Sequence, residues 1–374
     1  MKRSISLRVF LLVFFFSFLI IVPLLNAQKI KIKTEKGTPV VNNPKKPAPP
    51  PGVKSKLILE EELCIGDDAE EYLFAEESAY VSTAVDNEGN IYTVDPKLAE
   101  VRKFSPKGKL LKLFGKKGQG PEEMLFPGNI RVTAQNELMF TDRGNSRITF
   151  YSLNGEFLRY IPTYKYRLGR TKIDSNGKVV AVLYTYSEKK AIYEIKRFNN
   201  QLEPEFTIVS IDVTDERKGG RAYSPVLYWQ ITKEDNIIVG YPKKYEFYIF
   251  NPEGKVIRKI TKEYDAVKVP DELEEKEWGR YSKEQREKMN IVKYHHGFFY
   301  FTVDEEGRIF ARTWEQTKDK RGYFYDVFDA EGRYIAKIPI KAFVKLWIKG
   351  KLYTAEETED GFPVIKRYNV KWEL

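Results

Sequence analysis

The chain has 374 residues, of which 42% are hydrophobic and 14% aromatic, so it can bury a large core. A single cysteine excludes a disulfide-rich scaffold. The net charge of +10 would favour a nucleic-acid partner if it were spread over the fold, so its position along the chain has to be established first.

Residues 1–27 have the pattern of a secretory signal peptide. Three basic residues precede an apolar run over residues 9–25, and Ala27 ends a passable cleavage site. We expect an exported protein, either periplasmic or secreted. The alternative is an uncleaved membrane anchor, because the apolar run is at the short limit for crossing a bilayer.

Residues 28–56 are rich in proline and lysine, with eight lysines against one glutamate. This composition predicts a disordered, extended linker that packs against no core. Contact between the lysines and an anionic membrane surface is a second role for the segment. From residue 57 onward the charge is close to zero. We therefore expect no nucleic-acid partner.

One pattern recurs from residue 80 to the C-terminus: strand, Asp/Asn/Gly turn, strand, loop, strand, Gly turn, strand. The first turn occurs at residues 86–90, 135–137, 174–177, 234–236, 304–307 and 349–350, and the second at 104–108, 151–155, 198–200, 250–254 and 328–332. Four-stranded units at intervals of about 40 to 50 residues are typical of β-propeller blades. The pattern predicts an all-β, six-bladed β-propeller with four-stranded antiparallel blades over residues 57–374.

The sixth unit, residues 343–374, lacks the second glycine turn. A propeller ring has to close so that no long sheet edge is exposed. The β-rich segment at residues 57–63 is one choice for the outer strand of this blade. Residues 370–374 are the other, and the sequence leaves both open.

Residues 113–127, LFGKKGQGPEEMLFP, resemble a glycine-rich nucleotide loop at first sight. A phosphate-binding loop needs Gly-Lys-Ser/Thr after its glycines, and a dinucleotide loop has to open a helix. This stretch has neither feature and leads into another strand. It therefore predicts the crossing from the first blade to the second.

The GQGPEE stretch at residues 118–123 and TDRGNSRI at residues 141–148 resemble the NHL-repeat and bacterial six-bladed β-propeller proteins. The resemblance is strong over residues 80–161 and is only a pattern beyond them. It implies the propeller fold. It leaves function open, because such propellers include interaction modules, lyases and calcium-dependent hydrolases.

Residues 262–293 form the longest insertion, between the fourth and fifth blades. Ser282 and Gln285 have the spacing of a capping box, which predicts a helix running toward Ile291. The insertion is expected to act as a lid or a docking element, or else to decorate the fold.

His295 and His296 follow the insertion, and the chain has no third histidine. Adjacent residues on an extended segment point to opposite sides, so a zinc site would need other ligands. We expect no cofactor, with calcium in the channel left open. A Gly-x-Ser-x-Gly nucleophile motif is also absent from the sequence.

Strand direction places the loops between second and third strands, and the loops between blades, on one upper face, where a site should gather. The expected ligand-binding residues are Asp95, Asp142, Arg143, Asn145, Tyr241, Trp314 and Glu356. For Asp95 and Asp142 the alternative role is to cap a turn. For Arg143 and Arg147 it is to brace a loop.

These features predict an exported, monomeric binding module for an envelope or extracellular protein, peptide or glycan. Whether it is an enzyme is left uncertain, with a non-catalytic role favoured. The alternative is a metal-dependent hydrolase or lyase that uses calcium in the central channel.

Overall fold

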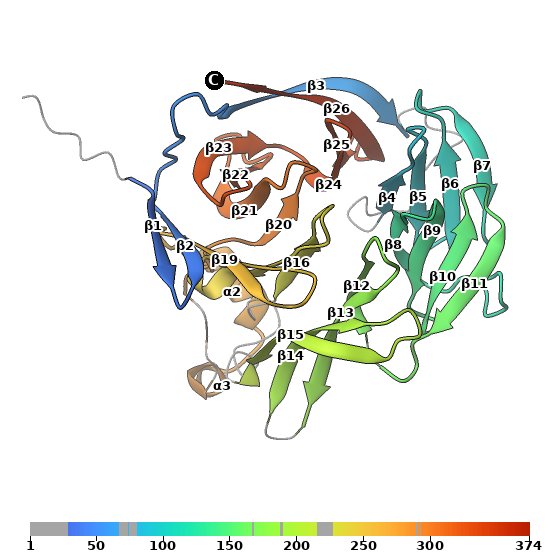
Figure 1. Ribbon diagram of the computed structural model, residues 1–374, viewed down its shortest axis with the longest axis horizontal. Helices are drawn as coiled ribbons and strands as arrows, with labels where there is room; N and C mark the ends of the chain where they lie inside the picture. Colours follow the sequence, from blue (N-terminus) through green and yellow to red (C-terminus); the bar gives the residue numbers. More distant parts are fainter. Residues whose placement is uncertain are drawn as a thin grey trace, which may run out of the picture.

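The computed structural model describes residues 29–66, 74, 81–166, 168–187, 190–214, 227–288, 291 and 293–374. In this part of the chain six sheets lie around a central axis (Figure 1). The predicted signal peptide lies outside the described residues. No helix within them has the length and apolar character needed to cross a bilayer.

Each blade has four antiparallel strands that follow chain order from the axis to the rim, and blade 6 takes its last strand from the N-terminal part of the chain (Figure 1). Blade 1 comprises β4 (Ser82–Val85), β5 (Ile91–Asp95), β6 (Glu100–Phe104) and β7 (Leu110–Phe114). Blade 2 comprises β8 (Pro127–Val132), β9 (Glu137–Asp142), β10 (Arg147–Ser152) and β11 (Phe157–Pro162). Blade 3 comprises β12 (Leu168–Ile173), β13 (Val179–Tyr186), β14 (Ala191–Phe198) and β15 (Pro204–Asp212).

Blade 4 comprises β16 (Tyr228–Ile231), β17 (Ile237–Tyr241), β18 (Glu246–Phe250) and β19 (Val256–Lys262), with a short 3-10 helix at Pro242–Lys244. Blade 5 comprises β20 (Tyr300–Val303), β21 (Ile309–Gln316), β22 (Tyr323–Phe328) and β23 (Tyr334–Ile340). Blade 6 comprises β24 (Phe343–Ile348), β25 (Lys351–Glu357), β26 (Pro363–Glu373) and β3 (Lys56–Ile65). The predicted six-bladed, four-stranded architecture is confirmed.

The ring closes by joining the two ends of the described chain. The N-terminal strand β3 is the outer strand of blade 6 and pairs antiparallel with β26, from Ile65 opposite Ile365 to Lys56 opposite Glu373 (Figure 1). Of the two choices that the sequence left open, residues 57–63 therefore supply the outer strand. Residues 370–373 extend the third strand instead.

The N-terminal segment corrects the prediction of a disordered linker over residues 28–56. Strands β1 (Lys31–Glu35) and β2 (Thr38–Asn43) form a hairpin, and β2 pairs in parallel with β19 at the rim of blade 4. Val40 and Val41 are 3% and 1% exposed. The physical reason is that the open edge of β19 offers backbone partners, and two adjacent valines supply apolar surface that the average composition conceals.

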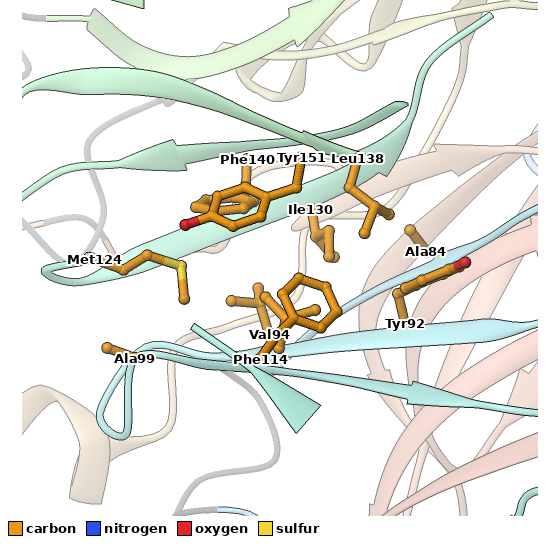
Figure 2. Packing of buried hydrophobic residues seen from close by; sticks show 11 residues of the cluster. Ala84, Tyr92, Val94, Ala99, Phe114, Met124, Ile130, Leu138, Phe140 and Tyr151 are labelled. Carbon is orange, nitrogen blue, oxygen red and sulfur yellow. The ribbon is translucent and has the colours of Figure 1, made fainter. Parts of the chain in front are cut away.

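The hydrophobic core lies between neighbouring blades. Between blades 1 and 2, the rings of Phe114 and Tyr151 are 5.8 Å apart, and Tyr151 stacks with Phe140 at 5.5 Å (Figure 2). Met124, from the loop between the blades, is fully buried in the same cluster. Gly115 has a φ of +96°, and a Cβ atom there would lie 2.0 Å from Cε of Met124. The glycine therefore lets the loop close over the core.

The insertion between blades 4 and 5 contains two helices, α2 (Asp271–Trp278) and α3 (Lys283–Lys288). The predicted capping box is present: the Gln285 amide donates to Oγ of Ser282 at 3.2 Å, and the Ser282 amide donates to Oε1 of Gln285 at 2.9 Å. Trp278 packs against Val269 in a small core of its own. The sequence analysis did not predict α2, whose own N-terminus has no side-chain cap.

Candidate functional site

The glycine-rich loop at residues 115–126 is a folded element of the upper face. Its two sides pair with each other, because the Gly118 amide donates to the Met124 carbonyl at 3.0 Å and the Met124 amide donates to the Lys116 carbonyl at 2.8 Å. The Glu123 carboxylate accepts from the Gly120 amide at 2.9 Å, which lowers the pKa of Glu123. The loop binds its own backbone groups.

Asp142 is fully buried beneath this loop and holds it in place. Its carboxylate accepts from the Leu125 amide at 2.8 Å, from Nδ2 of Asn145 at 2.7 Å and from Nε of Arg147 at 3.2 Å. Asn145 also donates to the Gly118 carbonyl at 3.0 Å. Asp142 and Asn145 therefore have internal partners that tie them to the loop.

Arg147 also holds the loop in place. Its guanidinium, in a residue that is 7% exposed, donates to the carbonyl of Gly120 at 2.8 Å and to that of Glu123. Asp95 has a comparable local role, because its carboxylate accepts from the amides of Lys97 and Leu98 at 2.9 and 3.0 Å. Hydrogen bonds from nearby backbone amides are what the turn-capping alternative predicts for Asp95 and Asp142.

Three other expected residues lie apart from this cluster. Tyr241 is half-buried and packs against the core between blades 3 and 4. Trp314 stacks on His295 with ring centroids 3.9 Å apart. Glu356 accepts hydrogen bonds from Thr354 at 2.6 Å and from the Tyr368 hydroxyl at 2.7 Å. None of these three residues lines the two cavities that Arg143 lines.

Arg143 is the member of the expected set that faces open space. It is exposed and lines two neighbouring cavities, of about 500 Å³ and about 700 Å³. The smaller cavity lies at the upper mouth of the central channel, where inner strands β4, β8 and β24 contribute to its lining. The larger one lies between blades 2 and 3.

The cavity between blades 2 and 3, called the upper groove below, combines aromatic, hydroxyl and cationic groups. Tyr164 at its edge is 82% exposed, and Arg170 is exposed beside it. Tyr184 lines the wall, where burial raises its pKa. Its ring stacks with that of Tyr186 at 6.3 Å. The upper groove thus presents rings and donors to solvent, a combination suited to recognition.

The tyrosines and Arg170 of the upper groove were not among the residues expected from the sequence. A signal for them exists: Tyr184 and Tyr186 stand two residues apart at the end of a strand, which places both on one face. Tyr164 and Tyr166 lie in the loop that joins blade 2 to blade 3. No single motif marks the set, because its members come from separate elements.

The sequence raised two questions about metals, a calcium site in the channel and zinc binding by the histidines. Among the described residues, no group of three or more His, Cys, Asp or Glu side chains is placed to hold a metal ion. His295 is 6% exposed against Trp314, and burial lowers its pKa to about 4. His295 is therefore a neutral packing residue near pH 7.

No family model matches the chain, and no curated protein matches it either. Among solved structures it is similar to a Bacteroides fragilis protein whose name describes it as exported. The TM-score is 0.57 and the sequence identity 11%, and the match covers 90% of this chain and 100% of that one. This likeness shows the fold alone.

Two enzymes are similar at a lower level. A Xanthomonas campestris gluconolactonase has a TM-score of 0.46 at 13% identity, covering 87% of this chain and 98% of that one. A streptogramin B lyase has a TM-score of 0.45 at 11% identity, covering 84% and 98%. At these TM-scores the two similarities say nothing about the activity of this chain. Membership of the NHL-repeat family stays a prediction. The chain is a six-bladed β-propeller, a fold that it shares with the B. fragilis protein.

Proposed function

We propose that the protein is an exported, non-catalytic binding module that recognises a protein, peptide or glycan through its upper loop face. The observation that carries this proposal is the upper groove, about 700 Å³ in volume and lined by Arg143, Arg170 and Tyr184. The N-terminal signal pattern and the name of the similar B. fragilis protein support export.

The chemistry of the upper groove favours a ligand with both flat and polar surfaces. Tyrosine and arginine supply large contact areas and directional donors, and both are enriched where binding energy is concentrated. Ser146 and Thr163 add hydroxyl groups to the lining. An extended peptide or a short glycan chain meets these requirements.

The calcium-dependent alternative places a metal at the axis of the channel. Calcium prefers carboxylate and carbonyl oxygens. The six inner strands, which the structure describes in full, carry Arg131, Arg170, Lys172 and Lys345 and neither Asp nor Glu. This lining does not fit a divalent cation, so we propose no reaction step through calcium.

The test is a screen of the mature chain against a glycan array and a phage-displayed peptide library, followed by affinity measurement for the best ligand. Arg143→Ala and Tyr164→Ala should each weaken binding about tenfold or more. Leu111→Ala is the matched control, because Leu111 is 51% exposed on the outer strand of blade 1. Equal affinities for all variants, or no ligand for the wild type, would contradict the proposal.

A further inference from the structure

The central channel has a lining that the upper-face function does not use. Arg131 on β8 and Lys345 on β24 line both the upper cavity of about 500 Å³ and a lower cavity of about 450 Å³. These two residues therefore mark the waist of the channel, where the cavities meet. Lys172 on β12 lines the lower cavity beside them.

Among the described residues, neither Arg131 nor Lys172 has an ion-pair partner. Nε of Arg131 is buried and has no hydrogen-bond partner in the described part of the chain. Lys172 donates to Oε1 of Gln230, a neutral partner that is itself held by a 2.9 Å bond to the Phe301 carbonyl. Nζ of Lys345 lies 4.7 Å from the ring centre of Phe343.

The pKa shifts agree with this geometry. Burial lowers the pKa of Lys172, and the positive charges of Arg131 and Arg170 lower it further. Burial also lowers the pKa of Lys345 to about 8 and that of Arg131 below its usual value. A cation held in a partly buried place without an acidic partner, as Arg131 and Lys172 are among the described residues, is stabilised when an anion supplies the counter-charge.

Acidic residues are present at the lower rim of the channel, and most are already engaged. Asp174 pairs with Arg197, and Asp304 pairs with Arg308 at 2.9 Å. The other two acids of the rim also accept hydrogen bonds: Asp235 from the Ser175 amide and Glu305 from the Lys349 amide.

The two mouths of the channel therefore differ in charge. Among the described residues, the upper cavity is lined by Arg131, Arg143 and Lys345 and by no acid, whereas the lower cavity has four acids beside four basic residues. The upper mouth therefore attracts an anion more strongly than the lower mouth, where acids balance part of the basic charge.

We propose that the waist of the channel binds an oxyanion, a phosphate, sulfate or carboxylate group, between Arg131, Lys172 and Lys345. The anion enters from the upper face past Arg143. Arginine offers it paired donors, and the lysines supply further charge-assisted hydrogen bonds. This site is separate from the upper groove between blades 2 and 3, so either can exist without the other.

The experiment measures binding of inorganic phosphate to the mature chain by calorimetry at constant ionic strength, with the melting temperature recorded alongside. Phosphate should bind and raise the melting temperature. Arg131→Met and Lys345→Met should each weaken binding about tenfold or more. Without phosphate, Arg131→Met should melt no lower than the wild type, because it removes a buried charge.

Lys255→Met is the control, because it removes one exposed positive charge at the turn after β18. It should leave phosphate affinity within about twofold. No phosphate or sulfate binding by the wild type would overturn the proposal, and so would equal affinity in all variants. If Arg131→Met does not fold, the phosphate affinity of Lys345→Met tests the proposal alone. A loss of about tenfold or more supports the site, and wild-type affinity overturns it.

Glucose 6-phosphate as a second probe identifies the source of the anion. Binding that is lost in Lys345→Met shows that the waist accepts an oxyanion carried by a larger molecule. Binding of inorganic phosphate alone shows a site for the free ion. Either result supports the site, provided that the wild type binds phosphate and Lys345→Met does not.

Discussion

The glycine-rich loop between blades 1 and 2 and the waist of the channel differ in how their polar groups are bonded. The loop at residues 115–126, together with Asp142 and Arg147, stands out in the sequence, yet its polar groups bind one another. The waist has ordinary strand sequences, yet it brings together three cations, and Nε of Arg131 has no hydrogen-bond partner among the described residues. Conspicuous residues can thus serve the backbone, whereas a polar group without a partner in the described part of the fold, such as Nε of Arg131, is the better indication of a ligand.

The largest expected effect tests the structural half of this comparison. Asp142→Ala leaves the buried Arg147 guanidinium without its carboxylate partner, so we expect a loss of about 3 to 5 kcal/mol in the free energy of unfolding. Urea denaturation measures it. A loss below about 1 kcal/mol would mean that Asp142 does not hold the loop and is free for another role.

A smaller loss is expected for Gly115→Ala. The added Cβ meets Cε of Met124, and the φ of +96° is unfavourable for alanine. We expect a cost of about 2 kcal/mol by thermal unfolding, from backbone strain and overpacking. Gly128→Ala is the control, because it has no atom within 4 Å of the added Cβ and no positive φ. Equal stability of the two variants would refute a packing role for Gly115.

His295 allows a pH-dependent test of whether a conspicuous residue has a structural role. The pKa of His295 is about 4 in the folded protein against about 6.5 when unfolded, so the unfolded chain takes up the proton first. Its contribution to stability is therefore complete above pH 6.5 and is lost as the pH falls toward 4.

The difference between wild type and His295→Phe isolates this effect from the carboxylates. Phenylalanine keeps a ring against Trp314. Between pH 7 and pH 4.5 the wild type should lose on the order of 2 kcal/mol more than the variant. Parallel pH profiles from urea denaturation would show that His295 is not a buried neutral residue.

The smallest effect on stability is expected at the binding face. Arg143 is exposed, and no hydrogen bond or ion pair of its guanidinium is found among the described residues. Arg143→Ala should change the free energy of unfolding by less than about 0.5 kcal/mol. A loss comparable to that of Asp142→Ala would make Arg143 another structural brace.

The sequence predicted the fold well because propeller blades repeat local signals. Turns such as that of Asp86, whose carboxylate accepts from the amides of Glu88 and Asn90, recur at a readable spacing. The hairpin at residues 31–43 escaped prediction, because its partner β19 is more than 200 residues away and its composition is dominated by neighbouring prolines and lysines.

The candidate site was less predictable for a physical reason. Asp142 and Asn145 bond to the loop in the structure. Asp and Asn serve both turns and binding sites, so a single sequence cannot separate the two roles. Arg131, Lys172 and Lys345 meet only after three blades are placed around the axis. Each is an unremarkable strand residue until then.

The most direct test of this account pairs two measurements, the free energy of unfolding and the affinity for inorganic phosphate, in Asp142→Asn and Arg131→Met. Asp142→Asn should lower stability and leave phosphate affinity within about twofold, because Asp142 binds the loop. Arg131→Met should retain stability and lose about tenfold or more in affinity. The opposite pattern, with affinity lost at Asp142 and stability lost at Arg131, would contradict the account.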